Sequence, residues 1–212
     1  MADSIFFDLD GTLTDSAEGI TKCAQLALSH FGIEYTDLNE LKVFVGPPLR
    51  EMFPKFGVPV DKIEEAVSVF RSRYLTVGKF ENSPYDGIVE MLEKLKTNGK
   101  RMFIATSKPE KTAKEILAHF DLDKYFENIC GATMDGSRDS KESVISYLLS
   151  ETKDLGSIVM VGDTDFDVYG ASSLGIPTIG VSWGYGKVCD MEFAGAIAIA
   201  KDVNELSELL CK

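Results

Sequence analysis

The chain has 212 residues, 44% of them hydrophobic, which is enough to bury a sizeable core. Thirty-four acidic residues against 22 basic ones give a net charge of −12, which argues against binding to nucleic acid or to an anionic membrane. The sequence has no long apolar run and no basic region at its start, and its four cysteines are scattered without metal-binding spacing. We therefore expect a soluble, cytoplasmic protein with reduced thiols.

The chain starts with a short apolar run that ends in two aspartates. Ile5-Phe6-Phe7 predicts a buried strand, and Gly11 lets the backbone turn sharply behind it. Asp8 and Asp10 are two residues apart, so on a strand their carboxylates point the same way. Like charges this close need a cation between them, and a hard divalent ion such as Mg²⁺ suits oxygen ligands. The pair therefore predicts a functional site.

The next segment, residues 16–80, has the pattern of helices. One apolar stripe lies within residues 20–31 and stops at Gly32, and another lies within residues 63–74. A shorter element is expected at 38–45, where the sequence Gly46-Pro47-Pro48 breaks it. Because no strand alternation is visible, this segment predicts a helical insertion directly after the first strand.

Beyond Pro84 the pattern changes to alternating strands and helices. We expect strands at 101–106, 125–129, 157–161, 177–181 and 196–199, and helices at 88–95, 112–120, 140–149, 169–174 and 203–210. This alternation is typical of a parallel sheet with helices on both faces. The predicted fold is α/β: a Rossmann-like core of residues 1–15 and 81–212, with an inserted helical cap of residues 16–80.

Ligands of open parallel sheets bind beyond the carboxyl ends of the strands. Three predicted strand ends carry acidic or hydroxyl groups: Asp8 and Asp10, Thr106 and Ser107, and Asp163 with Asp167. Some of these groups also fit a structural role, because Asp163, Asp165 and the two hydroxyl residues could each cap a helix. Their gathering at one edge of the sheet favours a shared site with a metal and a phosphate group.

A site that handles a phosphoryl group also needs a cation besides the metal. The candidates are Lys108, Lys141, Arg138, Arg50 and Lys22. Lys141 stands at the start of a predicted core helix, although a lysine in such a place is usually a solvated surface charge. The residues alone leave the choice among these candidates open.

Four motifs, in this order, resemble those of the haloacid dehalogenase-like hydrolases. They are Asp8-Leu9-Asp10-Gly11-Thr12-Leu13-Thr14, Thr106-Ser107, Lys141, and Gly162-Asp163 with Asp167. The helical insertion after the first motif resembles the cap of the phosphoglycolate phosphatase-like branch. Gly46-Pro47-Pro48-Leu49, Ser107-Lys108-Pro109 and residues 180–186 are also similar to that branch, in particular to its bacterial members named phosphoglycolate phosphatase or 5′-nucleotidase-like.

The resemblance implies a magnesium-dependent phosphatase for a small phosphomonoester, of the phosphoglycolate or nucleotide type. Asp8 would attack phosphorus and form an aspartyl-phosphate, and Asp10 would be the general acid and base. Mg²⁺ would be held by the Asp8 carboxylate, the Asp10 backbone carbonyl and Asp163, with Asp167 close behind. The phosphoryl group would be held by the hydroxyl motif (Thr106, Ser107) and by Lys141. Because Lys141 follows an unusual Asp-Gly-Ser-Arg-Asp-Ser stretch, Arg138 stays an alternative.

The cap would close over the site and select the substrate, with Arg50 as the expected contact to the substrate's distal end. The expected partner is a small phosphorylated metabolite, and the chain would be a monomer or a small homo-oligomer. The alternatives are a phosphomutase on the same scaffold and a non-catalytic module that binds a phosphorylated ligand. A dehalogenase is disfavoured, since such enzymes lack an acid/base aspartate at the position of Asp10.

Overall fold

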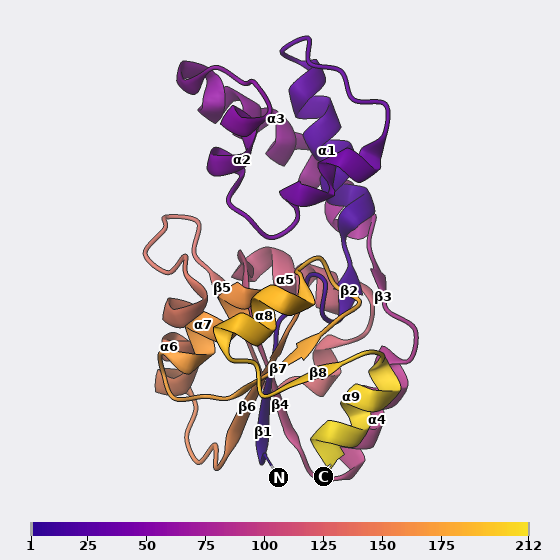
Figure 1. The fold of residues 1–212 in the computed structure, drawn as a ribbon, viewed down its shortest axis with the longest axis vertical. Helices are drawn as coiled ribbons and strands as arrows, with labels where there is room; N and C mark the ends of the chain where they lie inside the picture. The colour runs from indigo at the N-terminus through magenta and orange to yellow at the C-terminus, as the bar shows by residue number, and fades with distance from the viewer. Residues whose placement is uncertain (1, 212) are drawn as a thin grey trace. The chain divides into compact units, whose positions relative to one another are not determined.

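The computed structural model describes residues 2–211 (Figure 1). The chain divides into two compact units. The core unit combines the residues up to Thr14 with those from Pro84 onward, and the insertion unit is Asp15–Ser83. All four cysteines are free thiols. Within the described residues, no helix combines the length and the apolar character needed to cross a bilayer.

The core unit is built on a six-stranded sheet with the order β5-β4-β1-β6-β7-β8, and every neighbouring pair is parallel. β1 therefore lies in the middle of the sheet, flanked by β4 and β6. This arrangement brings the carboxyl ends of the three strands that carry the predicted motifs next to one another. The strands are β1 (Ser4–Phe7), β4 (Arg101–Pro109), β5 (Asn128–Ala132), β6 (Ile158–Gly162), β7 (Thr178–Val181) and β8 (Ala198–Ala200).

Both faces of the sheet are covered by helices (Figure 1). The side chains of β1 alternate, so that Ile5 and Phe7 pack on one face and Phe6 on the other. The first face is covered by α4 (Ile88–Thr97), α5 (Glu110–His119) and α9 (Val203–Cys211). The second face is covered by α6 (Lys141–Glu151) and α7 (Asp165–Ser172). The predicted fold class, an α/β parallel sheet of the Rossmann type, is confirmed.

Several elements differ from the prediction. The segment expected as a strand at 125–129 holds the end of a 3-10 helix, η4 (Asp123–Tyr125), and the strand follows it at Asn128–Ala132. α7 begins at Asp165, because Thr164 caps it and forms a reciprocal capping box with Asp167. The cap is therefore neither Asp163 nor Asp165, the two residues for which the sequence left a capping role open. α8 (Val188–Ala194) was not predicted.

The insertion unit is helical, as its periodicity predicts. It contains α1 (Ala17–Ser29), α2 (Leu49–Lys55) and α3 (Ile63–Tyr74), with the 3-10 helices η1 (Leu38–Phe44), η2 (Val60–Lys62) and η3 (Gly78–Phe80). α2 was not predicted, since it follows directly after the Gly-Pro-Pro break and carries Pro54 within it. Aromatic side chains from three of these elements form the unit's core: Phe44, Phe53, Phe70 and Tyr74.

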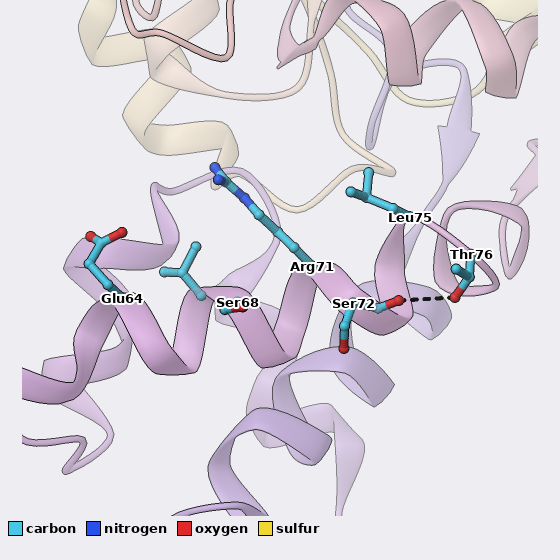
Figure 2. A pocket seen from close by; sticks show the side chains of 7 residues that line it. Glu64, Ser68, Arg71, Ser72, Leu75 and Thr76 are labelled. Carbon is cyan, nitrogen blue, oxygen red and sulfur yellow. Dashed lines mark hydrogen bonds between the residues drawn. The ribbon is translucent and has the colours of Figure 1, made fainter.

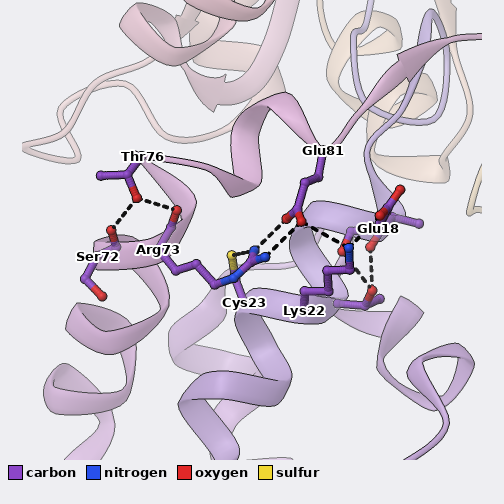
Figure 3. Close-up of polar contacts among 9 residues, drawn as sticks. Glu18, Lys22, Cys23, Ser72, Arg73, Thr76 and Glu81 are labelled. Atoms are coloured by element: carbon purple, nitrogen blue, oxygen red, sulfur yellow. Dashed lines mark hydrogen bonds and ion pairs between the residues drawn. The ribbon is translucent and has the colours of Figure 1, made fainter.

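A charged network ties the two ends of the insertion unit together (Figure 3). The Arg73 guanidinium donates to both carboxylate oxygens of Glu81 at 2.6 and 2.9 Å, and Lys22 donates to Glu81 at 3.0 Å. These hydrogen bonds lower the pKa of Glu81 to about 2, and those from Arg73 have the largest effect. Arg73 also donates to the buried Cys23 sulfur at 3.3 Å. Glu81 thus links α1 and α3 to the segment that leaves the unit.

The insertion unit also has an open pocket along one side of α3 (Figure 2). Arg71 and Glu64 are its charged residues, with Ser68, Ser72 and Thr76 as hydroxyl neighbours. The hydroxyl groups of Ser72 and Thr76 donate hydrogen bonds to backbone carbonyls of α3. The pocket is therefore a feature of one helix surface.

The chain crosses between the units twice. The first crossing is β2 (Thr14–Asp15) and the second is β3 (Ser83–Pro84), and the two form a separate two-stranded sheet. Within the core unit, the backbone N–H of Tyr85 donates to the carbonyl of Leu13 at 3.1 Å. The two crossings are therefore hydrogen-bonded neighbours although about 70 residues separate them in the sequence.

Candidate functional site

Four predicted residues meet at the carboxyl end of the central strands. Asp8 follows β1, Asp163 follows β6, Lys141 is the first residue of α6, and Asp167 lies in the first turn of α7. Asp8 is 9% exposed and Asp163 and Lys141 are more deeply buried, while Asp167 is inaccessible to solvent. β1 and β6 are parallel and Phe7 pairs with Val161, so the residues that come after this pair in the two strands lie side by side.

Lys141 is the cation of this group. Its Nζ lies 2.8 Å from Asp8 Oδ1 and 2.8 Å from Asp167 Oδ1, and it donates to the carbonyl of Ala105 at 3.1 Å. Burial opposes the charged form, but the two carboxylates outweigh it, so the pKa of Lys141 lies above its usual range. Ser140 caps the N-terminus of α6. Gly170 lets α7 pack closely against this N-terminus, since a Cβ at Gly170 would lie 2.7 Å from Lys141 Cβ. The ammonium is held between the two aspartates.

Asp163 is contacted by residues of two loops. Its Oδ2 accepts from the backbone N–H of Tyr185 at 2.8 Å, and its Oδ1 accepts from the Thr12 hydroxyl at 3.3 Å. Burial raises the pKa of Asp163 to about 8, with further contributions from the negative charges of Asp167 and Asp8. Without a further cation, this carboxyl group therefore favours its protonated form at neutral pH.

Asp167 has both a structural and an electrostatic role. Its Oδ2 accepts from the backbone N–H and the hydroxyl of Thr164 at 3.0 and 2.8 Å, which caps α7. Its Oδ1 faces Lys141. Burial raises the pKa of Asp167, and the ammonium of Lys141 opposes that rise.

Asp8, Asp163 and Asp167 together have the donor set of a metal site. Each can offer one carboxylate oxygen, and these three oxygens lie within 4.8 Å of one another. When all three are ionised, Lys141 balances only one of their charges. Oxygen donors are the ligands that hard divalent cations prefer, and such a cation would remove the repulsion that raises the pKa of Asp163. The residues present therefore fit a divalent metal ion.

The carboxylate of Asp10 is held separately from those three. Its Oδ2 forms an ion pair with Lys108 Nζ at 2.5 Å. No described residue donates a hydrogen bond to its other oxygen, Oδ1, which is buried. The resemblance assigns the metal contact of Asp10 to its backbone carbonyl, and that ligand stays a prediction.

The hydroxyl motif at the end of β4 is divided between two environments. Thr106 is buried, and its hydroxyl oxygen accepts the backbone N–H of Lys108 at 3.2 Å. Ser107 is exposed. Contacts of either side chain with a phosphate group stay predictions.

Glycines allow the close packing around Asp163. Gly11 has a φ of +81°, and a Cβ on it would lie 2.2 Å from Asp163 Oδ2. A Cβ on Gly184 would lie 2.3 Å from Asp163 Cβ. The loop that follows β7 thus forms one wall of the site, and Trp183 in that loop donates to the carbonyl of Thr12 at 3.2 Å. From the sequence, Trp183 and Tyr185 could line the mouth of the crevice, but packing of their loop against the terminal helix is the simpler expectation. The three glycines within residues 180–186 are the signal that indicates a close backbone approach.

Of the other candidate cations, Lys108 contacts Asp10, whereas Arg138, Arg50 and Lys22 are paired with glutamates. Arg138 pairs with Glu110 at 2.5 Å, donates to the carbonyl of Gly131, and stacks 3.8 Å from the Tyr147 ring centroid. It is therefore occupied outside the carboxylate group, and Lys141 is the candidate that contacts Asp8. In the insertion unit, Arg50 donates to both oxygens of Glu64 at 2.6 and 2.9 Å.

Comparisons with known proteins identify relatives that match nearly the whole chain. A family model described as haloacid dehalogenase-like hydrolase matches residues 5–181. A 5′-nucleotidase of Pseudomonas aeruginosa is 41% identical over 209 residues, covering 98% of this chain and 95% of that protein. Tyrosine-protein kinase PtkA of Mycobacterium tuberculosis is 42% identical over 209 residues, covering 97% of this chain and 72% of the kinase.

Solved structures show the same fold. A predicted phosphatase from Clostridium acetobutylicum superimposes with a TM-score of 0.91 at 40% identity, covering 99% of this chain and 98% of that one. The predicted family and the predicted hydrolase class are confirmed. On the family match and the near full-length relatives, the chain belongs to the haloacid dehalogenase-like hydrolases.

Proposed function

We propose that the protein is a magnesium-dependent phosphatase that hydrolyses a small phosphomonoester of the phosphoglycolate or nucleotide type. One observation carries the proposal. Asp8 lies at the end of the central strand, 2.8 Å from the buried ammonium of Lys141, within a group of three carboxylates that fits a divalent metal. A carboxylate held beside a cation and a metal site is suited to attack an anionic phosphoryl group.

In the first half of the reaction, an Asp8 carboxylate oxygen forms a bond to phosphorus while the bond from phosphorus to the substrate oxygen breaks. Asp10 gives its proton to the departing oxygen, so that the product leaves as a neutral alcohol. In the second half, Asp10 takes a proton from the water that attacks the aspartyl-phosphate. Inorganic phosphate then leaves, and both aspartates return to their starting states.

The remaining residues manage charge and orientation. Lys141 would contact a phosphoryl oxygen and offset its charge, and Thr106 and Ser107 would donate hydrogen bonds to the other oxygens. The loss of one such donor costs about 3–4 kcal/mol of transition-state stabilisation in comparable sites. Mg²⁺ would be held by Asp8, Asp163 and Asp167, together with the Asp10 backbone carbonyl. When bound, it would withdraw charge from the phosphoryl group as a Lewis acid.

We propose that the insertion unit is a cap that selects the substrate. It is joined to the core unit four residues after Asp10, so that the catalytic motif and the insertion share one short connection. Arg50 is the proposed contact for the distal group of the substrate, and Glu64 would release it on binding. A substrate panel tested with Arg50→Ala, and with Arg71→Ala as the matched arginine on α3, would show a changed profile for Arg50→Ala. An unchanged profile would remove Arg50 from the proposal.

Three competing activities give different results in one experiment. The purified protein is incubated with a library of phosphorylated metabolites and a phosphotyrosine peptide, with and without Mg²⁺, and released phosphate is measured. A phosphatase releases phosphate from one class of substrate only with Mg²⁺, and Asp8→Asn abolishes this release. A phosphomutase instead forms an isomeric sugar phosphate with little free phosphate, and a binding module releases none.

Kinase activity is a separate outcome, because a kinase is among the relatives. Incubation with labelled ATP and an unphosphorylated tyrosine peptide tests it directly. Label on the peptide without net release of phosphate would overturn the phosphatase proposal. Unchanged turnover in Asp8→Asn would overturn the proposed nucleophile.

A further inference from the structure

Lys108 is a buried lysine whose ammonium contacts the Asp10 carboxylate. Its side chain is 5% exposed and that of Asp10 is 15% exposed, and Nζ lies 2.5 Å from Asp10 Oδ2. A lysine side chain is normally exposed to solvent. We propose that Lys108 is a positioning residue that fixes the carboxylate of Asp10 for proton transfer to the leaving group. The inference rests on the proposed function, since it concerns the acid of that same reaction.

The backbone of β4 places this ammonium. The pairing of β4 with β5 shifts register between Thr106 and Pro109, so the strand bulges at Lys108. Gly131 on β5 permits the bulge, because a Cβ there would lie 2.5 Å from the Lys108 carbonyl oxygen. The Lys108 N–H donates to the Thr106 hydroxyl oxygen at 3.2 Å. The position of Lys108 is therefore built into the sheet and does not depend on a flexible loop.

The Asp10 carboxylate needs such a partner, because the other contacts of Asp10 fix its backbone and not its side chain. Asp10 forms an isolated bridge with Thr14, and the turn after it is made by Gly11. Of its two carboxylate oxygens, Oδ2 is held by Lys108, while Oδ1 accepts no hydrogen bond from the described residues. This geometry leaves Oδ1 as the oxygen that carries the transferable proton. That proton moves to the substrate oxygen as its bond to phosphorus breaks and the bond from phosphorus to Asp8 forms.

The test compares two substrates that need the acid to different degrees. An alkyl phosphate such as 2-phosphoglycolate has a poor leaving group and needs protonation, whereas p-nitrophenyl phosphate releases a stable phenolate without it. The quantity to measure is kcat/KM, which reports the steps up to the first phosphoryl transfer. We expect Lys108→Met to lower kcat/KM about 100-fold for the alkyl phosphate and much less for the aryl one. Lys108→Arg should recover part of the loss, and Lys111→Met, an exposed lysine at the start of α5, is the matched control.

A double-mutant cycle separates positioning from direct binding of substrate. If Lys108 acts through Asp10, the variant Asp10→Asn/Lys108→Met loses no more activity toward the alkyl phosphate than Asp10→Asn alone. Multiplying losses, or equal losses for both substrates, would overturn the inference, because Lys108 would then act on the phosphoryl group itself.

The four proteins of this cycle are the wild type, Asp10→Asn, Lys108→Met and the double variant. They are also unfolded in urea, which gives a readout independent of catalysis. A coupling between the two substitutions in the free energy of unfolding reports the ion pair even if no substrate turns over. Wild-type protein without phosphatase activity would overturn the proposed function, and with it the acid role of Asp10. Absence of coupling in unfolding would overturn the contact that the inference uses.

Discussion

Asp163→Asn should stabilise the metal-free protein while it weakens the proposed metal site. The side chain is buried and its oxygen lies within 4.8 Å of carboxylate oxygens from Asp8 and Asp167. Asparagine has the same shape, can still accept the Tyr185 N–H, and can meet the Thr12 hydroxyl with its amide group. The substitution therefore removes charge with little change in packing.

The magnitude follows from Coulomb's law. Two unit charges about 4.8 Å apart repel by about 3 kcal/mol at an effective dielectric constant of about 20. Asp163 experiences two such repulsions, and the attraction of Lys141, which is weaker than either, offsets only part of them. We therefore expect Asp163→Asn to raise the free energy of unfolding by at least about 3 kcal/mol at pH 8 without metal.

The pH dependence has a definite sign. The pKa of Asp163 is about 8 in the folded protein against an ordinary value of 3.8, so the folded state keeps a proton that the unfolded state loses. Its stabilising contribution is complete below pH 4 and is lost as the pH rises to about 8, by up to about 1.4 kcal/mol per pH unit. Asp163→Asn should flatten this decline.

Urea unfolding between pH 5 and 8, in EDTA and in Mg²⁺, measures both effects. Mg²⁺ should stabilise the wild-type protein more at pH 8 than at pH 5, and should stabilise Asp163→Asn much less. Asp165→Asn, two residues further along in α7 and outside the carboxylate group, is the matched control. An Asp163→Asn variant that is less stable than wild type at pH 8 in EDTA would refute the electrostatic reasoning.

Three further substitutions test the structure. Lys141→Met removes the only cation that contacts Asp8 among the described residues. It should destabilise the protein by about 3–5 kcal/mol in urea unfolding and lower kcat at least 100-fold. A loss of stability below about 1 kcal/mol would contradict the buried ion pair. Gly11→Ala should leave little folded, active protein, because its Cβ would lie 2.2 Å from a carboxylate oxygen, whereas Gly99→Ala, with a φ of +71° and open space around it, should cost only about 1 kcal/mol. Glu81→Gln should lower the stability of the insertion unit by about 1–2 kcal/mol, measured by hydrogen exchange in α1 and α3, and unchanged protection would show that the charged network contributes little.

The parts of the site that could be predicted are those in which the residue type itself carries the signal. Asp8 and Asp163 each follow a strongly apolar run, so the strands were evident and their ends were known. The parallel sheet then required these ends to meet. Lys141 could be placed because it lies in the first turn of a helix whose start the sequence predicts. Asp167 could be placed by its spacing of four residues from Asp163, although the helix begins four residues earlier than expected.

Lys108 and the loop after β7 could not be assigned in the same way. Whether a lysine is solvated or buried depends on the β4 bulge, which rests on the close approach of Gly131 in another strand. Tyr185 donates to Asp163 through its backbone N–H, which every residue except proline has, so the residue type does not predict this hydrogen bond. Similarly, α2 is seven residues long and contains a proline, so local periodicity does not reveal it.

The paired crossings at β2 and β3 make the insertion exchangeable. Since the two strands are already hydrogen-bonded neighbours, the core needs only its two adjacent ends to be joined, and it does not depend on what is placed between them. A short turn or a different helical module could replace residues 16–82 with a small change in loop-closure entropy. If the proposed function holds, the residues at the ends of the central strands would keep the same phosphoryl chemistry, while replacement of the whole insertion would change the substrate that is selected.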